Sequence, residues 1–219
     1  MSKTLLLIVG SPKLKRSNSY SIAEYLKNEL LEQGWNIEIH FSHQAFTNEN
    51  TMNTLLKKTE QNTIIGIIFP LYVDAIPGPL IQTLEILTQQ KHIRNDQKIF
   101  TIVNSGFPEP HQSQLAVDMI EQFTKEYNAT FIGGLTIGAG GIISGMPIEQ
   151  IKHRSKRLIK ALNLTIQSLN QTHTISEEAK KLLSKPVFSK TLYNTFANIG
   201  WKQQAKKYGV TNLYQTPDK

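Results

Sequence analysis

The sequence contains no cysteine among its 219 residues. A disulfide framework and thiolate chemistry are therefore excluded. It also lacks any apolar run near the roughly 18 residues that a membrane-spanning helix needs. The first residues, Met1 to Lys3, lead directly into an apolar segment, without the long apolar centre and cleavage site of a secretory signal. From these absences we expect a cytoplasmic protein.

Motifs for metals, nucleotides and nucleic acids are absent as well. Five of the six histidines show no metal-ligand spacing with carboxylates, and the sixth, His111, stands where a helix is expected to start. No metal site is therefore predicted, and His111 is at a position where a histidine is more often a surface residue than a catalytic proton donor. Gly10 is followed by Lys15 without a second glycine, so neither the P-loop nor the dinucleotide fingerprint is present. Without basic repeats interleaved with aromatic residues, nucleic acid is not an expected partner.

The net positive charge of the chain comes from its C-terminal end. Residues 1–150 contain 11 Lys+Arg and 14 Asp+Glu, a net charge of −3, whereas residues 151–219 contain 13 and 3, a net charge of +10. Such an asymmetry suits an acidic partner, a phosphate-bearing ligand or anionic lipid near the C-terminus. We favour the simpler interpretation, in which the lysines solvate exposed helix faces.

The first 26 residues predict an anion site. The apolar run Leu5–Val9 indicates a buried strand, and Gly10 ends it where the backbone turns. Ser17, Asn18 and Ser19 then stand where a helix N-cap belongs, ahead of apolar residues at helical spacing. Because the first amides of a helix lack internal partners and its dipole favours negative charge, a phosphate is the expected guest.

Strands and helices alternate along the rest of the chain. Strict β–α alternation predicts a parallel sheet covered by helices on both faces. Five such units fit an α/β three-layer sandwich with strand order 2-1-3-4-5, the flavodoxin-like order. We expect strands at 35–41, 63–69, 98–103 and 130–137, helices at 51–60, 78–91, 113–127 and 147–169, and a loop at 42–50.

This topology brings three separate loops together. The carboxyl ends of parallel strands line one crevice, so the loops that begin at Gly10, Pro70 and Asn104 are expected to enclose one ligand. Tyr72 offers an aromatic wall for a planar ring, and three prolines between 70 and 79 stiffen the second loop.

These loops resemble those of the NAD(P)H-dependent FMN reductase family. The segment GSPKLKRSNS resembles its G-S-x-R-x-x-S-x-[NS] phosphate loop, Pro70–Pro79 resembles its P-x-Y-x-x-x-x-P segment, and Asn104–Glu109 resembles its N-x-G-F-P-E segment. Gly138–Gly141 is similar to a G-x-G-G turn, and Asn198–Val210 to the C-terminus of long members. One residue departs from the pattern: Lys13 stands where arginine is usual, which weakens bidentate phosphate binding.

The resemblance implies an FMN-dependent oxidoreductase. Such an enzyme passes hydride from NADPH or NADH through flavin N5 to a small-molecule acceptor, such as a quinone, free flavin, nitro or azo compound, and the flavin carries the chemistry. The residues implied for the phosphate are Ser11, Lys13, Arg16, Ser17, Asn18 and Ser19, and those for the ring are Pro70, Leu71, Tyr72, Val73, Asn104, Ser105, Gly106 and Phe107.

Two other functions stay open at this point. A flavodoxin-type electron carrier would show a T-x-T-G-x-T phosphate loop and an acidic docking surface, and the sequence has neither. A non-catalytic binding module of the same fold is kept open by Lys13.

The chain divides into a flavodoxin-like domain, residues 1–170, and a basic amphipathic helical extension, residues 171–219. In the extension, Phe188, Leu192, Phe196 and Ile199 recur at helical spacing. We expect this stripe to pack on its own domain or on a second copy in a homodimer; contact with a membrane surface is the less favoured alternative.

Overall fold

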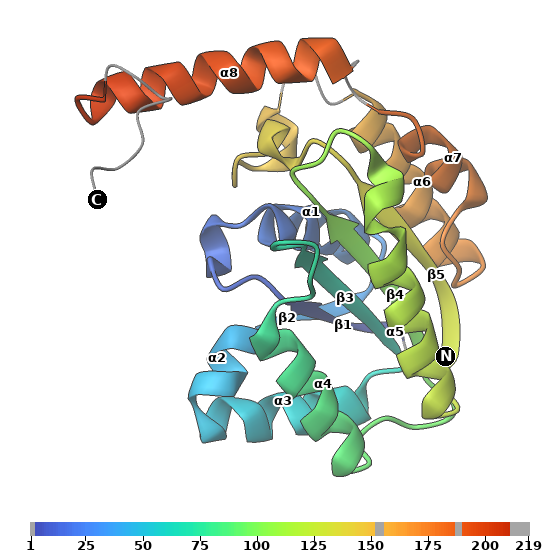
Figure 1. Cartoon of the computed structure of the whole chain (residues 1–219). Coiled ribbons are helices and arrows are strands. Elements are labelled where there is room, and N and C mark those ends of the chain that lie inside the picture. Colours follow the sequence, from blue (N-terminus) through green and yellow to red (C-terminus); the bar gives the residue numbers. More distant parts are fainter. Residues whose placement is uncertain (1–2, 152–155, 187–189, 211–219) are drawn as a thin grey trace.

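Five parallel strands form the centre of the molecule (Figure 1). The computed structural model describes residues 3–151, 156–186 and 190–210, apart from the side chains of Lys190, Leu192, Phe196 and Ala197. The strand order is β2-β1-β3-β4-β5, so the predicted flavodoxin-like topology is confirmed. The strands are β1 (Thr4–Val9), β2 (Asn36–Phe41), β3 (Ile64–Pro70), β4 (Lys98–Asn104) and β5 (Thr130–Ile137).

Helices cover both faces of the sheet and complete three layers. One apolar core lies between the sheet and α1 (Asn18–Leu31) with α6 (Lys156–Gln171), and a second lies on the other face beneath α3 (Glu49–Gln61), α4 (Gly78–Gln89) and α5 (Gln114–Glu126). All seven residues of β3 are buried, because a central parallel strand has apolar layers on both sides.

Two expectations about secondary structure are wrong. Residues 42–50, expected as a loop, contain α2 (Ser42–Thr47), whose Ser42 and Ala45 are buried. Because only these two positions face inward, apolar residues do not recur at helical spacing in this segment. The helix expected from Pro147 begins instead as a 3-10 turn, Ile148–Gln150, held by the fully buried Ile148, and α6 starts at Lys156 after residues 152–155, which lie outside the described part.

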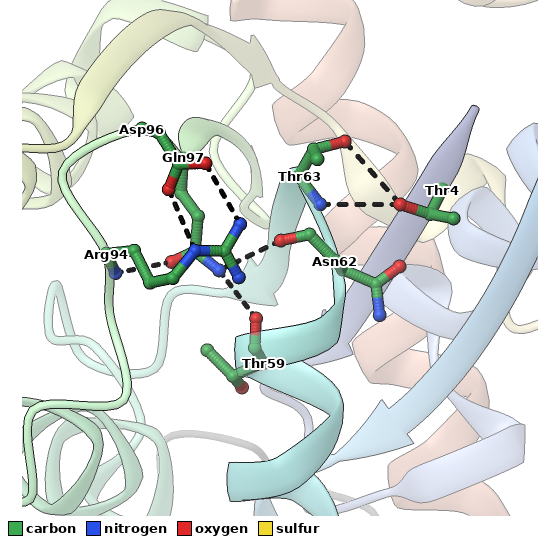
Figure 2. A network of polar contacts seen from close by, with 7 residues as sticks. All are labelled: Thr4, Thr59, Asn62, Thr63, Arg94, Asp96 and Gln97. Atoms are coloured by element: carbon green, nitrogen blue, oxygen red, sulfur yellow. Dashed lines mark hydrogen bonds and ion pairs between the residues drawn. The ribbon is translucent and has the colours of Figure 1, made fainter. Parts of the chain in front are cut away.

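A buried glutamine fastens the end of α3 to the start of β4 (Figure 2). Gln97 Nε2 donates to the carbonyl oxygens of Thr59 at 2.6 Å and Asn62 at 2.9 Å, and its Oε1 accepts from the Arg94 amide at 2.9 Å. The last carbonyls of a helix have no internal partner, so Gln97 satisfies groups that would otherwise be buried without a hydrogen bond.

The two last helices differ in how they contact the domain. In α7 (Glu177–Leu183), Ser176 caps the helix, and Ala179 and Leu183 are buried against the β5 side of the sheet. In α8 (Lys190–Lys207), the described side chains are exposed except for the half-buried Tyr193 and Ala205. Phe188 of the predicted apolar stripe lies outside the described residues.

Helix α8 lies across the end of the sheet to which the strands point, and its C-terminal half extends beyond the rest of the molecule in Figure 1. Its first turn is joined to this end of the sheet by Tyr193, whose Oη donates to the carbonyl oxygen of Gly106 at 2.5 Å. Among the described residues, no helix is both long and apolar enough to cross a membrane.

Candidate functional site

A cavity of about 330 Å³ opens at the carboxyl rim, the end of the sheet at which the parallel strands end. Loops that follow β1, β3 and β4 supply most of its lining, and the segment between β5 and α6 supplies the rest. The lining residues are Ser11, Lys13, Arg16, Ser17, Asn18, Ser19, Pro70, Leu71, Tyr72, Asn104, Ser105, Gly106, Gly140, Gly141, Ser144 and Gly145.

Most residues that the sequence singled out therefore meet in one place. Twelve of the fourteen residues implied for the cofactor line this cavity, and Val73 and Phe107 do not. The Val73 side chain is 98% exposed at the tip of its loop, while Phe107 is half-buried and accepts a backbone hydrogen bond from Ala139 at 2.6 Å. His111 lies away from this cavity, in a groove along β5.

The N-terminus of α1 offers two free amides to the cavity. Ser17 is the N-cap: its Oγ accepts from the Tyr20 amide at 3.1 Å and donates to the Leu14 carbonyl at 2.6 Å. The Ser17 carbonyl takes the first helical bond, from Ser21. The amides of Asn18 and Ser19 are the first two of α1 and have no intrahelical partner. With the positive end of the helix dipole behind them, they suit an anion.

The Asn18 side chain connects this helix start to the segment after β5. Its Nδ2 donates to the Gly140 carbonyl at 2.7 Å and its Oδ1 accepts from the Gly145 amide at 2.9 Å. Gly145 has a φ of +69°, and a Cβ there would lie 2.6 Å from the Arg16 carbonyl oxygen, so only glycine allows this approach. Asn18 therefore positions the segment after β5, which forms the fourth wall of the cavity. Its side-chain amide is bonded within the protein at both ends, so only its backbone amide is left for a ligand.

Asn104 connects the other loops in the same way. Its Nδ2 donates to Ser19 Oγ at 2.8 Å and to the Phe69 carbonyl at 3.0 Å, while its own carbonyl accepts from the Leu71 amide at 2.9 Å. The side chain is buried. Because both amide hydrogens are bonded within the protein, Asn104 holds the three loops at a fixed spacing.

Ser105 has a polar group left for a ligand. Its side chain is 3% exposed, lines the cavity, and its Oγ has no hydrogen-bond partner. A buried hydroxyl without a partner costs about 1–3 kcal/mol, so this hydroxyl is a candidate hydrogen-bonding group for a ligand in the cavity. Beside it, a Cβ built on Gly106 or Gly141 would meet nothing within 4 Å, so both glycines leave open space.

The second loop closes as a tight two-residue turn. The backbones of Tyr72 and Ala75 exchange hydrogen bonds of 3.1 and 3.0 Å, and Val73 and Asp74 between them have φ values of +50° and +59°. A β-branched residue in this left-handed region is strained. The turn points Val73 to solvent and leaves Leu71 and Tyr72 along the cavity, where the Tyr72 Oη reaches to 3.5 Å from Ser11 Oγ.

The electrostatics of the cavity are positive. Lys13 and Arg16 line it together with the start of α1, and no aspartate or glutamate is among the lining residues. Within the part of the chain that the structure describes, no group of three or more His, Asp or Glu side chains is placed to hold a metal ion. The cavity therefore suits a ligand with an anionic group at one end. The other end of such a ligand would pack against apolar side chains and backbone.

Sequence reasoning missed two lining residues, Ser144 and Gly145. The run Gly138–Gly141 marked the neighbourhood because glycine runs allow close backbone approach, but nothing near Ser144 signals a site. Their position depends on Asn18, more than a hundred residues earlier in the chain. That contact exists only in the folded protein.

No family model matches the sequence, and no curated protein matches it significantly. Solved structures do match the fold. An NADH:FMN oxidoreductase in its apo form aligns with a TM-score of 0.58 at 13% identity, covering 82% of this chain and 94% of that one. An NADPH-quinone reductase from P. pentosaceus aligns with a TM-score of 0.55 at 16% identity, covering 78% and 99%.

A third solved structure was determined with a ligand. General stress protein 14 from Treponema denticola, in complex with FMN, aligns with a TM-score of 0.54 at 15% identity, covering 74% of this chain and 98% of that one. Solved structures that share this fold thus include reductases of the kind that the sequence resembles. At this level of identity the likeness establishes the flavodoxin-like fold.

Proposed function

We propose that this chain is an FMN-dependent oxidoreductase that uses NADPH or NADH to reduce a small-molecule acceptor. One observation carries the proposal: a single cavity joins an anion site at a helix N-terminus to a slot that holds a buried hydroxyl without a partner. FMN has this composition, a phosphate connected to a planar ring with a polar edge. When bound, it supplies the hydride chemistry at its N5.

The phosphate is assigned to the start of α1. The amides of Asn18 and Ser19 and the hydroxyl of Ser11 provide donors, and Lys13 and Arg16 provide charge. Hydrogen bonds to a charged group contribute about 1.5–3 kcal/mol each, which makes this end the anchor of the cofactor. Ser17 shapes the site as the N-cap, because its hydroxyl proton is donated to Leu14.

The ring is assigned to the slot between the second loop, which begins at Pro70, and the third loop, which begins at Asn104. Leu71 and Tyr72 give it apolar surface, Ser105 gives a donor for its polar edge, and the open space beside Gly106 and Gly141 admits its flat outline. The family resemblance and the names of the solved structures support the flavin, the pyridine nucleotide and an acceptor such as a quinone. A cytoplasmic location stays a prediction from the sequence.

The test begins with the purified protein and FMN. Binding is measured by the change in flavin fluorescence, with riboflavin as the matched control because it lacks only the phosphate. We expect FMN to bind at least tenfold more tightly than riboflavin. NADPH and NADH are then added anaerobically, and loss of the yellow absorbance, restored by a quinone, supports the enzyme.

The other outcomes contradict the proposal in different ways. Colour that neither pyridine nucleotide bleaches would indicate an electron carrier. Absence of any FMN binding would indicate a non-catalytic binding module that shares only the fold with these enzymes.

A further inference from the structure

The C-terminal helix reaches the candidate site through one side chain. Helix α8 lies across the end of the sheet at which the cavity opens (Figure 1). Tyr193, in the first turn of this helix, is half-buried, and its Oη donates to the carbonyl oxygen of Gly106 at 2.5 Å. Gly106 lines the cavity, whereas Tyr193 does not. The hydrogen bond therefore holds the third loop from outside the cavity.

The sheet domain also holds the segment that leads into α8. The guanidinium group of Arg157 in α6 donates to the carbonyl oxygens of Lys185 and Pro186, at 3.4 Å in the case of Pro186. Helix α6 packs on the sheet through buried residues such as Leu162. Pro186 is four residues before Lys190, the first residue of α8. Arg157 thus keeps the start of α8 close to the domain on which Tyr193 acts.

Three consecutive carbonyl groups of the third loop accept hydrogen bonds. The Ser105 carbonyl accepts from the Gly140 amide at 2.8 Å, and the Phe107 carbonyl accepts from the Ala139 amide at 2.6 Å. Both of these donors belong to the segment after β5. The Gly106 carbonyl between them is bonded to α8 instead. The middle of the loop therefore depends on the C-terminal helix, while the residues on either side of it do not.

Gly106 is the residue at which this loop can turn. It has no Cβ, and a Cβ built there would meet nothing within 4 Å, so neither its own side chain nor a neighbour limits rotation of the backbone. In a trans peptide the N–H points opposite to the C=O, so a rotation would exchange the positions of the Gly106 oxygen and the Phe107 amide. The Phe107 amide has no hydrogen-bond partner among the described residues. The bond from Tyr193 is thus the hydrogen bond that fixes the direction of this peptide.

We propose that Tyr193 is a positioning residue of the candidate cofactor site, which holds the Gly106–Phe107 peptide in one orientation at the edge of the slot for the ring. The C-terminal helix then acts on the ring end of the cavity and not on the phosphate end. A loop that is already ordered loses less conformational entropy when a ligand binds, so the bond favours binding of the ring. The effect on the ring rests on the proposed function, whereas the effect on the loop does not.

The first test uses the full-length protein without cofactor. Tyr193→Phe removes only the hydroxyl oxygen, and Tyr208→Phe is the matched control, because it makes the same change in a 72% exposed residue that follows the same helix. Amide hydrogen exchange is measured by mass spectrometry in residues 138–141, whose amides at Ala139 and Gly140 donate to the third loop. We expect exchange to be about fivefold faster in Tyr193→Phe and unchanged in Tyr208→Phe. Unchanged exchange in Tyr193→Phe would overturn the proposal.

A second substitution tests whether the motion occurs at Gly106. The φ of Gly106 is not in the left-handed region and the space around it is open, so alanine fits the observed conformation. Alanine also has fewer backbone conformations than glycine. Adding Gly106→Ala to Tyr193→Phe should therefore slow the exchange of residues 138–141 again, toward the wild-type rate. A double variant that exchanges as fast as Tyr193→Phe would refute the role of this peptide.

The third test measures the affinity for FMN and for riboflavin by fluorescence titration. We expect Tyr193→Phe to weaken the binding of both by about threefold to fivefold, because both contain the ring and one hydrogen bond is lost. The visible absorption spectrum of the bound flavin should shift as well, because the surroundings of the ring change. Tyr208→Phe should alter neither quantity. A loss of affinity for FMN alone would place the effect at the phosphate and contradict the proposal, as would wild-type affinities with an unchanged spectrum.

Urea denaturation separates a positioning role from a general structural one. Tyr193→Phe and Tyr208→Phe should unfold at the same urea concentration. An earlier transition in Tyr193→Phe, together with faster exchange in all five strands, would show a general loss of stability and overturn the proposal. If the wild-type protein bound neither flavin, the proposed function would fail, but the exchange experiment would still decide whether Tyr193 holds the third loop.

Discussion

Asn18 and Ser105 both line the cavity, yet their side chains have opposite hydrogen-bonding states. The Asn18 amide bonds to Gly140 and Gly145, whereas the Ser105 hydroxyl is buried without a partner. Removing a bonded group harms the fold, but removing a buried group that lacks a partner does not. The two residues therefore separate stability from ligand binding.

We expect Asn18→Ala to lower the free energy of unfolding of the cofactor-free protein by about 1–3 kcal/mol, since two hydrogen bonds are lost. Ser105→Ala should leave that free energy unchanged or slightly higher, and weaken FMN binding about fivefold to tenfold, equivalent to one net hydrogen bond. Urea denaturation and fluorescence titration measure the two quantities. A Ser105→Ala protein that binds FMN like the wild type would remove Ser105 from the site.

Val73 stores strain in the second loop. Its φ of +50° places a β-branched side chain in a conformation that costs about 1–2 kcal/mol. Asparagine tolerates this region, so Val73→Asn should raise the free energy of unfolding by about 1 kcal/mol. Val73→Ala is the control, because alanine keeps a Cβ and gains less. The comparison is made by urea denaturation, and a destabilised Val73→Asn protein would mean that the turn has another conformation.

Single residues also hold whole elements together, as Gln97 does for α3 and β4. Gln97→Leu removes the donor to Thr59 and Asn62 and the acceptor for Arg94, in a fully buried position. We expect a loss of about 2–4 kcal/mol in the free energy of unfolding. Gln89→Leu, at the exposed end of α4, should change it by less than about 0.5 kcal/mol. Equal effects of the two substitutions would contradict the role of the network.

The edge strand β2 makes stability depend on pH. Burial lowers the pKa of His40 below 6.5, an effect that Glu38 partly offsets. Because the folded state then binds fewer protons than the unfolded state, stability falls as pH drops below about 6.5. The hydrogen bond from Lys58 lowers the pKa of Glu38, so its contribution is present above about pH 4.5 and is lost as pH falls through the lower folded value.

The His40 effect can be isolated between pH 7.5 and 5.5, above the Glu38 range. The wild-type Tm should decrease between these two values, and His40→Gln should decrease less. Scanning calorimetry at both pH values measures the difference. If His40→Gln lost as much Tm as the wild type, burial of this histidine would not be the cause.

Elements were predictable from the sequence where their signal is local. Strands β1, β3 and β4 are apolar runs, whereas β2 alternates apolar and polar residues. All five strands lie within a residue or two of their expected ranges. Helix α2 was missed because only two of its six residues face inward. The cavity lining was predictable to a large extent because strand ends converge in a parallel sheet. Ser144, Gly145 and the outward turn of Val73 were not, because they depend on contacts between distant segments and on a strained backbone.

At the scale of the whole molecule, the cavity draws its walls from segments between residues 11 and 145, which attach to four of the five strands. A ligand held by all of these segments binds the folded chain and has no equivalent site in the unfolded one. Its binding free energy is therefore added to the stability of the entire sheet domain. In the complex that we propose, Lys13, Arg16 and the start of α1 act on the phosphate alone, so the stabilisation by FMN should also depend on salt concentration.

FMN at a hundredfold excess over its Kd should stabilise the protein by about 2.7 kcal/mol and raise Tm by roughly 5–10 °C for a chain of this size. Riboflavin at the same concentration should raise it much less, because it lacks the phosphate that the helix start and the two cations bind. Salt screens exposed charges, so the FMN shift should shrink at 1 M NaCl while the riboflavin shift stays the same. The Lys13→Gln/Arg16→Gln double variant is the control and should bring the FMN shift close to that of riboflavin. Differential scanning fluorimetry measures all four conditions, and equal shifts for FMN and riboflavin in the wild type would show that the cavity does not bind the phosphate, which would contradict the assignment of the α1 N-terminus.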